Sequence, residues 1–466
     1  MRDRTTINPA IVLAIVCTGA VLSTTDQFIV NIAFPSLQAS FGGVKLSTLS
    51  WVLNAYSIVF AALLVPAGRL ADRASRKAAF LIGVAVFTGA SALCAAANGV
   101  DVLIAARVLQ ATGAAILVPS SLGLLLAAYP PEQRTRAVRI WGSMAALGAA
   151  IGPVLGGLLL TASWRWIFLV NVPVGIAALL AGRRWLPSPP RVDEAFPDLA
   201  GALVLMGAIG LLTLGLVKAP DWGWGATSTV GSLVVAVLLF GLFIVRSARH
   251  RSPVIELALL RVRPFAVSSL ALLLFSASFA ASLLSIVVWA QEAWGWSPLR
   301  TGLAFAPGPL MVPVFALSAG RVIERFGAGR VAAAGCISFG LGALLWVTSM
   351  GLDAHYLTAM LPGALLTGVG VGLALPTLTA AGATALPPQR FATGSAVLMM
   401  SRQVGFTLGV AILVAVLGTP TSPQGRLDAF RHGWETVAIA ALVAAASALV
   451  LVARRRPAEV PEPAVG

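Results

Sequence analysis

Charged residues are scarce in this chain of 466 residues. Asp, Glu, Lys and Arg together make up 11% of it, whereas hydrophobic residues make up 58% and the mean hydropathy is +0.91. A soluble globular chain carries roughly 25% charged residues, so this chain has too few polar side chains to cover a water-exposed surface. Its high hydrophobic content also excludes intrinsic disorder. The class that remains is a polytopic membrane protein.

Cysteine and histidine are also rare, with three residues of each. The cysteines lie inside apolar runs without a C-x-x-C spacing, which argues against a disulfide framework or a zinc site. The histidines are scattered near the ends of apolar segments, where a solvated loop explains them better than metal binding does. We therefore expect no metal site. These six residues are Cys17, Cys94, Cys336, His250, His355 and His432.

Several catalytic motifs are missing as well. The sequence has no G-x4-GK-[ST] phosphate loop, which disfavours ATP-driven transport by this chain. It has neither a G-x-S-x-G nucleophile elbow nor an H-E-x-x-H motif, so a membrane hydrolase would lack its nucleophile or its metal. The chain is predicted not to be an enzyme and to need no cofactor. An ion gradient is the energy source that remains.

Apolar runs long enough to cross a bilayer dominate the sequence. A spanning helix needs about 20 apolar residues, and fourteen runs qualify, none with the alternating pattern of a lipid-facing barrel strand. The predicted fold class is therefore an all-α polytopic membrane protein. The predicted spans are 10–34, 50–68, 79–98, 102–125, 138–161, 166–182, 199–217, 228–246, 266–289, 302–320, 331–350, 357–382, 391–417 and 434–453.

The basic residues predict the orientation of these spans. With the N-terminus inside, the cytoplasmic segments hold 24 Lys and Arg residues, the external segments hold six, and Arg107 and Arg402 lie within spans. This asymmetry follows the positive-inside rule and predicts that both termini are cytoplasmic. The formal net charge of +15 is then mainly a topology signal, with contacts to anionic membrane lipid and not to nucleic acid.

A short motif occurs twice, 252 residues apart. Both copies have a glycine, an acid four residues later and then an arginine, and each follows a predicted span at an inner loop. Two parallel halves of six spans around a central site would produce this repeat. The expected domains are 1–190, 191–262 with two inserted spans, 263–456, and a disordered tail at 457–466. The motif residues are Gly68, Asp72, Arg73 and Arg76 in the first copy and Gly320, Glu324 and Arg325 in the second.

Two charged residues stand out inside the predicted spans. Asp26 is the only acid well inside a span, and burying it costs about 2.5–3.5 kcal/mol. It is either functional or a structural residue that bonds Ser23 or a neighbouring helix. Arg107 lies in the same outer half and shares a helix face with Gln110. Asp26 is a candidate partner for Arg107, directly or through water, unless Arg107 snorkels to the external surface.

The fifth span contains glycines at every fourth position. Gly148, Gly152 and Gly156 form a smooth stripe for close helix approach, and Gly157 adds another small position. Pro153 removes one backbone hydrogen bond and kinks the helix. Helix packing alone would explain the stripe, but the added proline and glycine pair favour a specialised transport helix.

These motifs resemble those of the major facilitator superfamily, and specifically its fourteen-span drug:proton antiporter branch. The resemblance covers nearly the whole chain. It rests on residues 25–35 in the first span, 68–77 in the first inner loop, 107–113 in the fourth span and 148–157 in the fifth. Residues 402–405 with Gly409 resemble span 13 of the branch. Arg402 would lie about three turns inside that span, or near its inner end if the helix begins later.

The resemblance implies a proton-coupled antiporter that exports small, mainly hydrophobic compounds by alternating access. Asp26 would be the proton site and Arg107 its modulator, while the repeated inner-loop motif would stabilise one gate state and the glycine–proline stretch would mark an exporter. Candidate substrate contacts are Asn31, Asn54, Tyr56 and Gln110.

The expected location is the bacterial plasma membrane, where the protein would act as a monomer. An importer or symporter of the same fold stays an alternative, and so does a membrane sensor that binds ligand without transport.

Overall fold

The computed structural model describes residues 8–188, 195–387 and 390–451, and every regular element in this part of the chain is a helix. Fourteen helical segments are long and apolar enough to span a membrane, which confirms the predicted fold class. The helices are α1 Pro9–Ile32, α2 Phe34–Ser40, α3 Leu46–Leu49, α4 Trp51–Ala74, α5 Arg76–Ala96, α6 Val100–Ala128, α7 Pro131–Leu159, α8 Trp166–Leu169, α9 Asn171–Trp185, α10 Leu199–Trp222, α11 Thr227–Arg249, η1 Leu257–Arg261, α12 Arg263–Glu292, α13 Pro298–Phe305, α14 Pro307–Phe326, α15 Ala328–Ser349, η2 Tyr356–Met360, α16 Leu361–Thr384, α17 Phe391–Leu417 and α18 Pro423–Leu449.

Capping side chains explain where several helices begin. The side chain of the residue before the helix accepts a backbone N–H from the first turn, which satisfies a donor that has no partner within the helix. Proline in the first turn supports α1, α13 and α18 in addition, because its missing N–H is not needed there. The capping residues are Asn8, Ser75, Asp198, Ser297 and Ser422.

Several predicted spans differ from the observed helices. The span predicted at 434–453 begins at Pro423 as α18, and the span predicted at 166–182 is divided at Val170 between α8 and α9. The span predicted at 138–161 begins at Pro131 as α7, because helix-compatible charged residues extend the helix beyond the apolar run. The span predicted at 302–320 is interrupted at Ala306 between α13 and α14, where Pro307 starts a new helix. The predicted tail at 457–466 lies outside the described residues.

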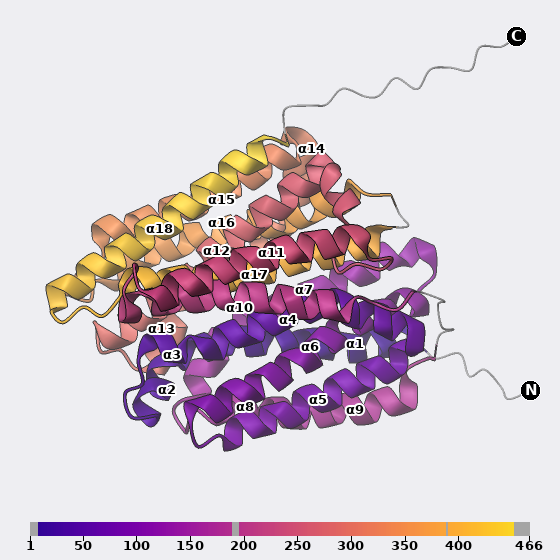
Figure 1. The fold of residues 1–466 in the computed structure, drawn as a ribbon, viewed down its shortest axis with the longest axis horizontal. Coiled ribbons are helices and arrows are strands. Elements are labelled where there is room, and N and C mark those ends of the chain that lie inside the picture. Colours follow the sequence, from indigo (N-terminus) through magenta and orange to yellow (C-terminus); the bar gives the residue numbers. More distant parts are fainter. Residues whose placement is uncertain (1–7, 189–194, 388–389, 452–466) are drawn as a thin grey trace, which may run out of the picture.

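The helices form two groups, with α10 and α11 running across the middle between them (Figure 1). The early helices α1–α9 lie on one side and α12–α18 on the other. Helix α10 packs against both α4 and α17, whereas α11 packs mainly on α10. The inserted pair is therefore attached to the seam between the two groups.

Asp198 joins the two inserted helices. Its carboxylate caps α10 by accepting the Gly201 N–H at 2.8 Å and also accepts Arg246 of α11 at 2.8 Å. Burial of the carboxylate opposes its ionisation, but the hydrogen bonds from Arg246 and Gly201 outweigh burial and hold the pKa of Asp198 below its usual value. The ionised form therefore stabilises the folded state.

We predict that Asp198→Ala lowers the stability of the purified protein by about 1–3 kcal/mol at pH 7, because a cap and a charged hydrogen bond are lost. Since folding lowers the pKa, this contribution is present above the ordinary value of about 3.9 and is lost as the pH falls below it. Thermal unfolding in detergent between pH 3 and pH 8 measures the effect. Exposed Asp353 provides the control variant Asp353→Asn, and a pH-independent difference between Asp198→Ala and wild type would contradict this account.

Candidate functional site

The centre of the N-terminal helix group is an ion pair between Asp26 of α1 and Arg107 of α6. The Arg107 Nη1 atom lies 2.5 Å from Asp26 Oδ2, and the side chains are 1% and 0% exposed. The contact is direct, which resolves the alternatives left by the sequence. Ser23, the structural partner considered for Asp26, instead lies 3.4 Å from the Tyr56 hydroxyl.

The second oxygen of Asp26 is also fully engaged. Gln110 Nε2 donates to Asp26 Oδ1 at 2.8 Å and Asn171 Nδ2 of α9 donates to the same atom at 3.0 Å. Gln110 also donates to Ser91 Oγ of α5 at 2.8 Å. A buried carboxylate is tolerated only with such partners, and this one holds α1, α5, α6 and α9 together.

Arg107 is held from the other side by α4. Its Nε atom donates to the Val52 carbonyl at 3.1 Å, and its guanidinium carbon lies 4.2 Å from the centre of the Tyr56 ring, a cation–π contact. The Nη2 atom is buried and has no hydrogen-bond partner in the described part of the chain. The pair is closed to solvent in this conformation.

Sequence reasoning missed two members of this network. Ser91 and Asn171 are polar residues within or beside apolar runs, as Asp26 is, and that was the available signal. Tyr56 and Gln110 were predicted to contact substrate, but both are buried around the ion pair, with exposed fractions of 1% and 0%. A helical periodicity places a residue on a face, but it does not show which helix covers that face.

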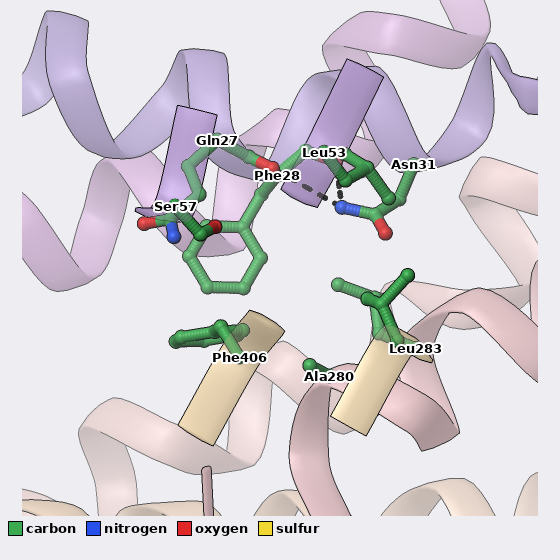
Figure 2. A pocket seen from close by; sticks show the side chains of 9 residues that line it. Gln27, Phe28, Asn31, Leu53, Ser57, Ala280, Leu283 and Phe406 are labelled. Atoms are coloured by element: carbon green, nitrogen blue, oxygen red, sulfur yellow. Dashed lines mark hydrogen bonds between the residues drawn. The ribbon is translucent and has the colours of Figure 1, made fainter. Parts of the chain in front are cut away.

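A small cavity of about 20 Å³ lies between the two helix groups, as Figure 2 shows. Phe28 projects into it from α1 and Phe406 from α17, and the two rings are 6.1 Å apart. Asn31 is the one predicted substrate contact on its wall, and its Nδ2 donates to the Gln27 carbonyl at 3.1 Å. The lining residues are Gln27, Phe28, Asn31, Leu53, Ser57, Ala280, Leu283, Phe406 and Val410.

Asn54, the remaining predicted contact, is fully buried in α4. Neither its Oδ1 nor its Nδ2 atom has a hydrogen-bond partner among the described residues. Leaving a buried amide unpaired costs about 1–3 kcal/mol.

The glycine stripe of α7 packs against α1, the helix that carries Asp26. A Cβ atom at Gly152 would lie 3.0 Å from Phe28 Cβ, and one at Gly156 would lie 2.8 Å from Ile29 Cγ1. At Gly148, the backbone carbonyl accepts the Thr25 hydroxyl at 3.1 Å. Such close approach needs the absence of side chains.

The far end of α7 contacts α13 of the second helix group. A Cβ atom at Gly157 would lie 2.8 Å from the Pro298 carbonyl oxygen, and one at Gly302 would lie 2.6 Å from the Pro153 carbonyl oxygen. The predicted exporter stretch therefore links the helix of the ion pair to the opposite group.

The first inner-loop motif is packed and paired. Asp72 Oδ1 accepts Arg76 Nε at 2.5 Å, and Arg76 Nη1 reaches the Gly123 carbonyl at 3.4 Å. Gly68 faces Pro119, whose Cβ would lie 3.2 Å from an added Cβ. Arg73 lies in the last turn of α4.

The second copy of the motif is different. Glu324 and Arg325 are exposed, Glu324 forms no ion pair within residues 8–188, 195–387 and 390–451, and Gly320 has open space around it. The repeat predicted from sequence is present in the chain, but its two copies have different surroundings in this conformation.

Near the first inner loop, an ion cluster that was not predicted from the sequence joins the two helix groups. Arg69 of α4 lies 3.2 Å from Glu256, and Arg390 before α17 lies 3.5 Å from the other oxygen of Glu256. Among the described residues, no group of three or more His, Cys, Asp or Glu side chains is placed to hold a metal ion.

We predict that Gly152→Leu lowers the melting temperature of the purified protein by several degrees and abolishes transport, because a side chain there must push α7 away from α1. Overpacking of this kind costs about 1–3 kcal/mol. Gly142→Leu is the matched control on the same helix, since nothing lies within 4 Å of a Cβ there. Equal effects of the two substitutions would show that the close approach is unimportant.

The sequence profile of the Major Facilitator Superfamily matches residues 16–409 and 269–465. The tetracenomycin C resistance and export protein of Streptomyces glaucescens is 32% identical over 430 residues, which cover 91% of this chain and 77% of that protein. The methylenomycin A resistance protein of Streptomyces coelicolor is 32% identical over 442 residues, which cover 94% of this chain and 91% of that protein.

Solved structures resemble the fold as well. The crystal structure of the peptide transporter POT in complex with sulfate superposes with a TM-score of 0.69 at 17% identity, covering 95% of this chain and 94% of that one. At this identity the likeness concerns the fold alone.

Proposed function

This chain belongs to the Major Facilitator Superfamily, and from this premise we propose that it is a proton-coupled antiporter that exports small, mainly hydrophobic compounds. It is a multi-pass membrane transporter and not an enzyme. Export is favoured because similar proteins are named for antibiotic resistance and export. The proposed setting is the bacterial plasma membrane, with both termini cytoplasmic, protons as the driving ion and a monomer as the working unit.

The observation that carries the proposal is the buried ion pair of Asp26 and Arg107. Its charges balance while Asp26 is ionised, so the site is stable when closed. Protonation of Asp26 removes the negative charge and leaves Arg107 without its counter-ion, which is costly in a buried site. The protonated and ionised forms therefore favour different arrangements of the helices, as coupling to a proton gradient requires.

Helix α7 offers a route by which this change reaches the second helix group. It packs on α1 through Gly152 and Gly156 and on α13 through Gly157. A shift of α1 on protonation would therefore move α7 relative to α13, and the two groups would tilt about the central cavity. The cavity is too small for a substrate in the present state, so this arrangement corresponds to a closed or nearly closed centre.

Two other functions are less well supported. An importer or symporter could use the same fold, but the glycine–proline stretch and the relatives named for export favour outward transport. A sensor that binds without transport would have no use for a buried, charge-balanced pair linked to the opposite helix group. Flux measured in inverted vesicles separates all three.

We predict that Asp26→Asn abolishes proton-driven accumulation of substrate in inverted vesicles. The substrate is first identified by comparing the resistance of cells with and without the gene to a panel that includes tetracenomycin C and methylenomycin A. An imposed gradient with an acidic lumen then drives uptake by wild type. Asp26→Asn is expected to lose at least about 90% of this uptake, because an amide cannot carry the proton.

Two controls accompany this test. Asp101→Asn removes an exposed acid from the same helix as Arg107 and should leave uptake unchanged. The double variant Asp26→Asn with Arg107→Gln removes both buried charges, so it should recover the stability lost in the single variant without recovering coupling. Gradient-driven uptake by a folded Asp26→Asn protein would refute the proton site.

A further inference from the structure

A second intramembrane cation, Arg402, lies on α17 and has no partner like that of Arg107. It is eleven residues after the start of the helix at Phe391, or about 17 Å along its axis, and thus near the middle of the helix and not at its inner end. The side chain is partly buried. Its Nε atom is buried without a hydrogen-bond partner, and no carboxylate among the described residues pairs with it.

The helix face that carries Arg402 is turned toward the N-terminal helix group. Phe406, one turn further along, lines the central cavity, and the Arg402 guanidinium lies 5.5 Å from the centre of its ring. The adjacent Gln403 accepts a hydrogen bond from Gln27 of α1 at 2.9 Å. Met399, one turn earlier, packs against the apolar cluster of the N-terminal group. Arg402 therefore lies at the seam, one turn from the cavity.

The charge at this seam is not balanced. Asp26 is fully buried, and its two oxygens already accept Arg107, Gln110 and Asn171. Glu435, midway along α18, is exposed. The cavity wall itself carries no ionisable side chain. An unpaired guanidinium at membrane depth is costly, and intramembrane charges of this kind mark substrate or ion pathways.

We propose that Arg402 binds the anionic group of the transported compound, and that the cargo therefore includes aromatic carboxylates. This inference rests on the proposed function and deepens it. A guanidinium matches a carboxylate with two parallel hydrogen bonds, and Phe406 holds the Arg402 side chain at the edge of the cavity. Phe28, Phe279 and Phe406, whose ring centres are about 6 Å apart, provide the aromatic surface for the rest of the molecule.

The position of Arg402 also connects substrate to the proton site. Gln27 is the neighbour of Asp26 in sequence, and its bond to Gln403 joins the two helices next to Arg402. A carboxylate bound at Arg402 adds a negative charge close to this link. Binding of cargo would therefore change the electrostatic environment of the contact between α1 and α17, which must separate during transport.

The test measures binding of two matched probes to the purified full-length protein in detergent, by quenching of tryptophan fluorescence. The probes are naphthalene-2-carboxylate and naphthalene-2-carboxamide, which differ in charge but hardly in size. Wild type is expected to bind the carboxylate at least about tenfold more tightly than the amide, as a charged hydrogen bond predicts. Arg402→Gln should abolish this preference with unchanged amide binding, and Arg402→Lys should retain part of it.

Arg426→Gln, which removes a cation at the far end of the protein near Glu292, is the control and should keep the preference. No saturable binding of the carboxylate to wild type, or an equal preference in folded Arg402→Gln, overturns the proposal. Displacement of the carboxylate by phosphatidylglycerol would assign Arg402 to a lipid headgroup and also overturn it. The test needs no proton gradient, so loss of the carboxylate preference is read separately from the gradient-driven uptake that tests the proton site.

Discussion

The ion pair between Asp26 and Arg107 is the constraint on which the N-terminal half of the structure depends. Four further residues contact it, Val52 and Tyr56 of α4, Gln110 of α6 and Asn171 of α9. Ser91 of α5 in turn accepts a hydrogen bond from Gln110. A carboxylate and a guanidinium at this depth are stable only as a pair with its remaining donors and acceptors satisfied. Because α1, α4, α5, α6 and α9 all contribute to this network, a change in the charge of Asp26 affects the packing of several helices and not of one alone.

The glycines of α7 determine how that change can travel. A helix with side chains at positions 148, 152 and 156 would be separated from α1 by a layer of apolar atoms that can yield. With glycine there, the backbones touch, and close-packed surfaces transmit displacement because they have little free space. The same helix meets Pro298 through Gly157, so one rigid element lies between the charge and the opposite helix group.

The two halves are alike in their order of helices but not in their chemistry. The first half encloses the ion pair of Asp26 and Arg107, whose charges cancel. The second half carries Arg402 at the seam, and this cation forms no ion pair with the residues that the structure describes. The first inner-loop motif is paired through Asp72 and Arg76, whereas Glu324 of the exposed second copy forms no ion pair with any residue that the structure describes. Helix α10 contacts α4 and α17 across the seam. In the function we propose, the first half holds the proton site and the second half binds the transported compound.

The fourteen spans, the unusual burial of Asp26 and the glycine stripe could be predicted from the sequence, because hydrophobic length, charge inside a span and a four-residue period are local properties of the chain. The residues that surround Asp26 and Arg107 could not be predicted from the sequence. Asn171 bonds Asp26, and Ser91 bonds Gln110, from helices that are far from Asp26 in sequence. Tyr56, which was expected to line the cavity, covers Arg107. The depth of Arg402 was also open, since it depends on where α17 begins. Which helices meet, and which charge is left without a counter-ion, is decided by packing between segments hundreds of residues apart, and only the tertiary structure contains that information.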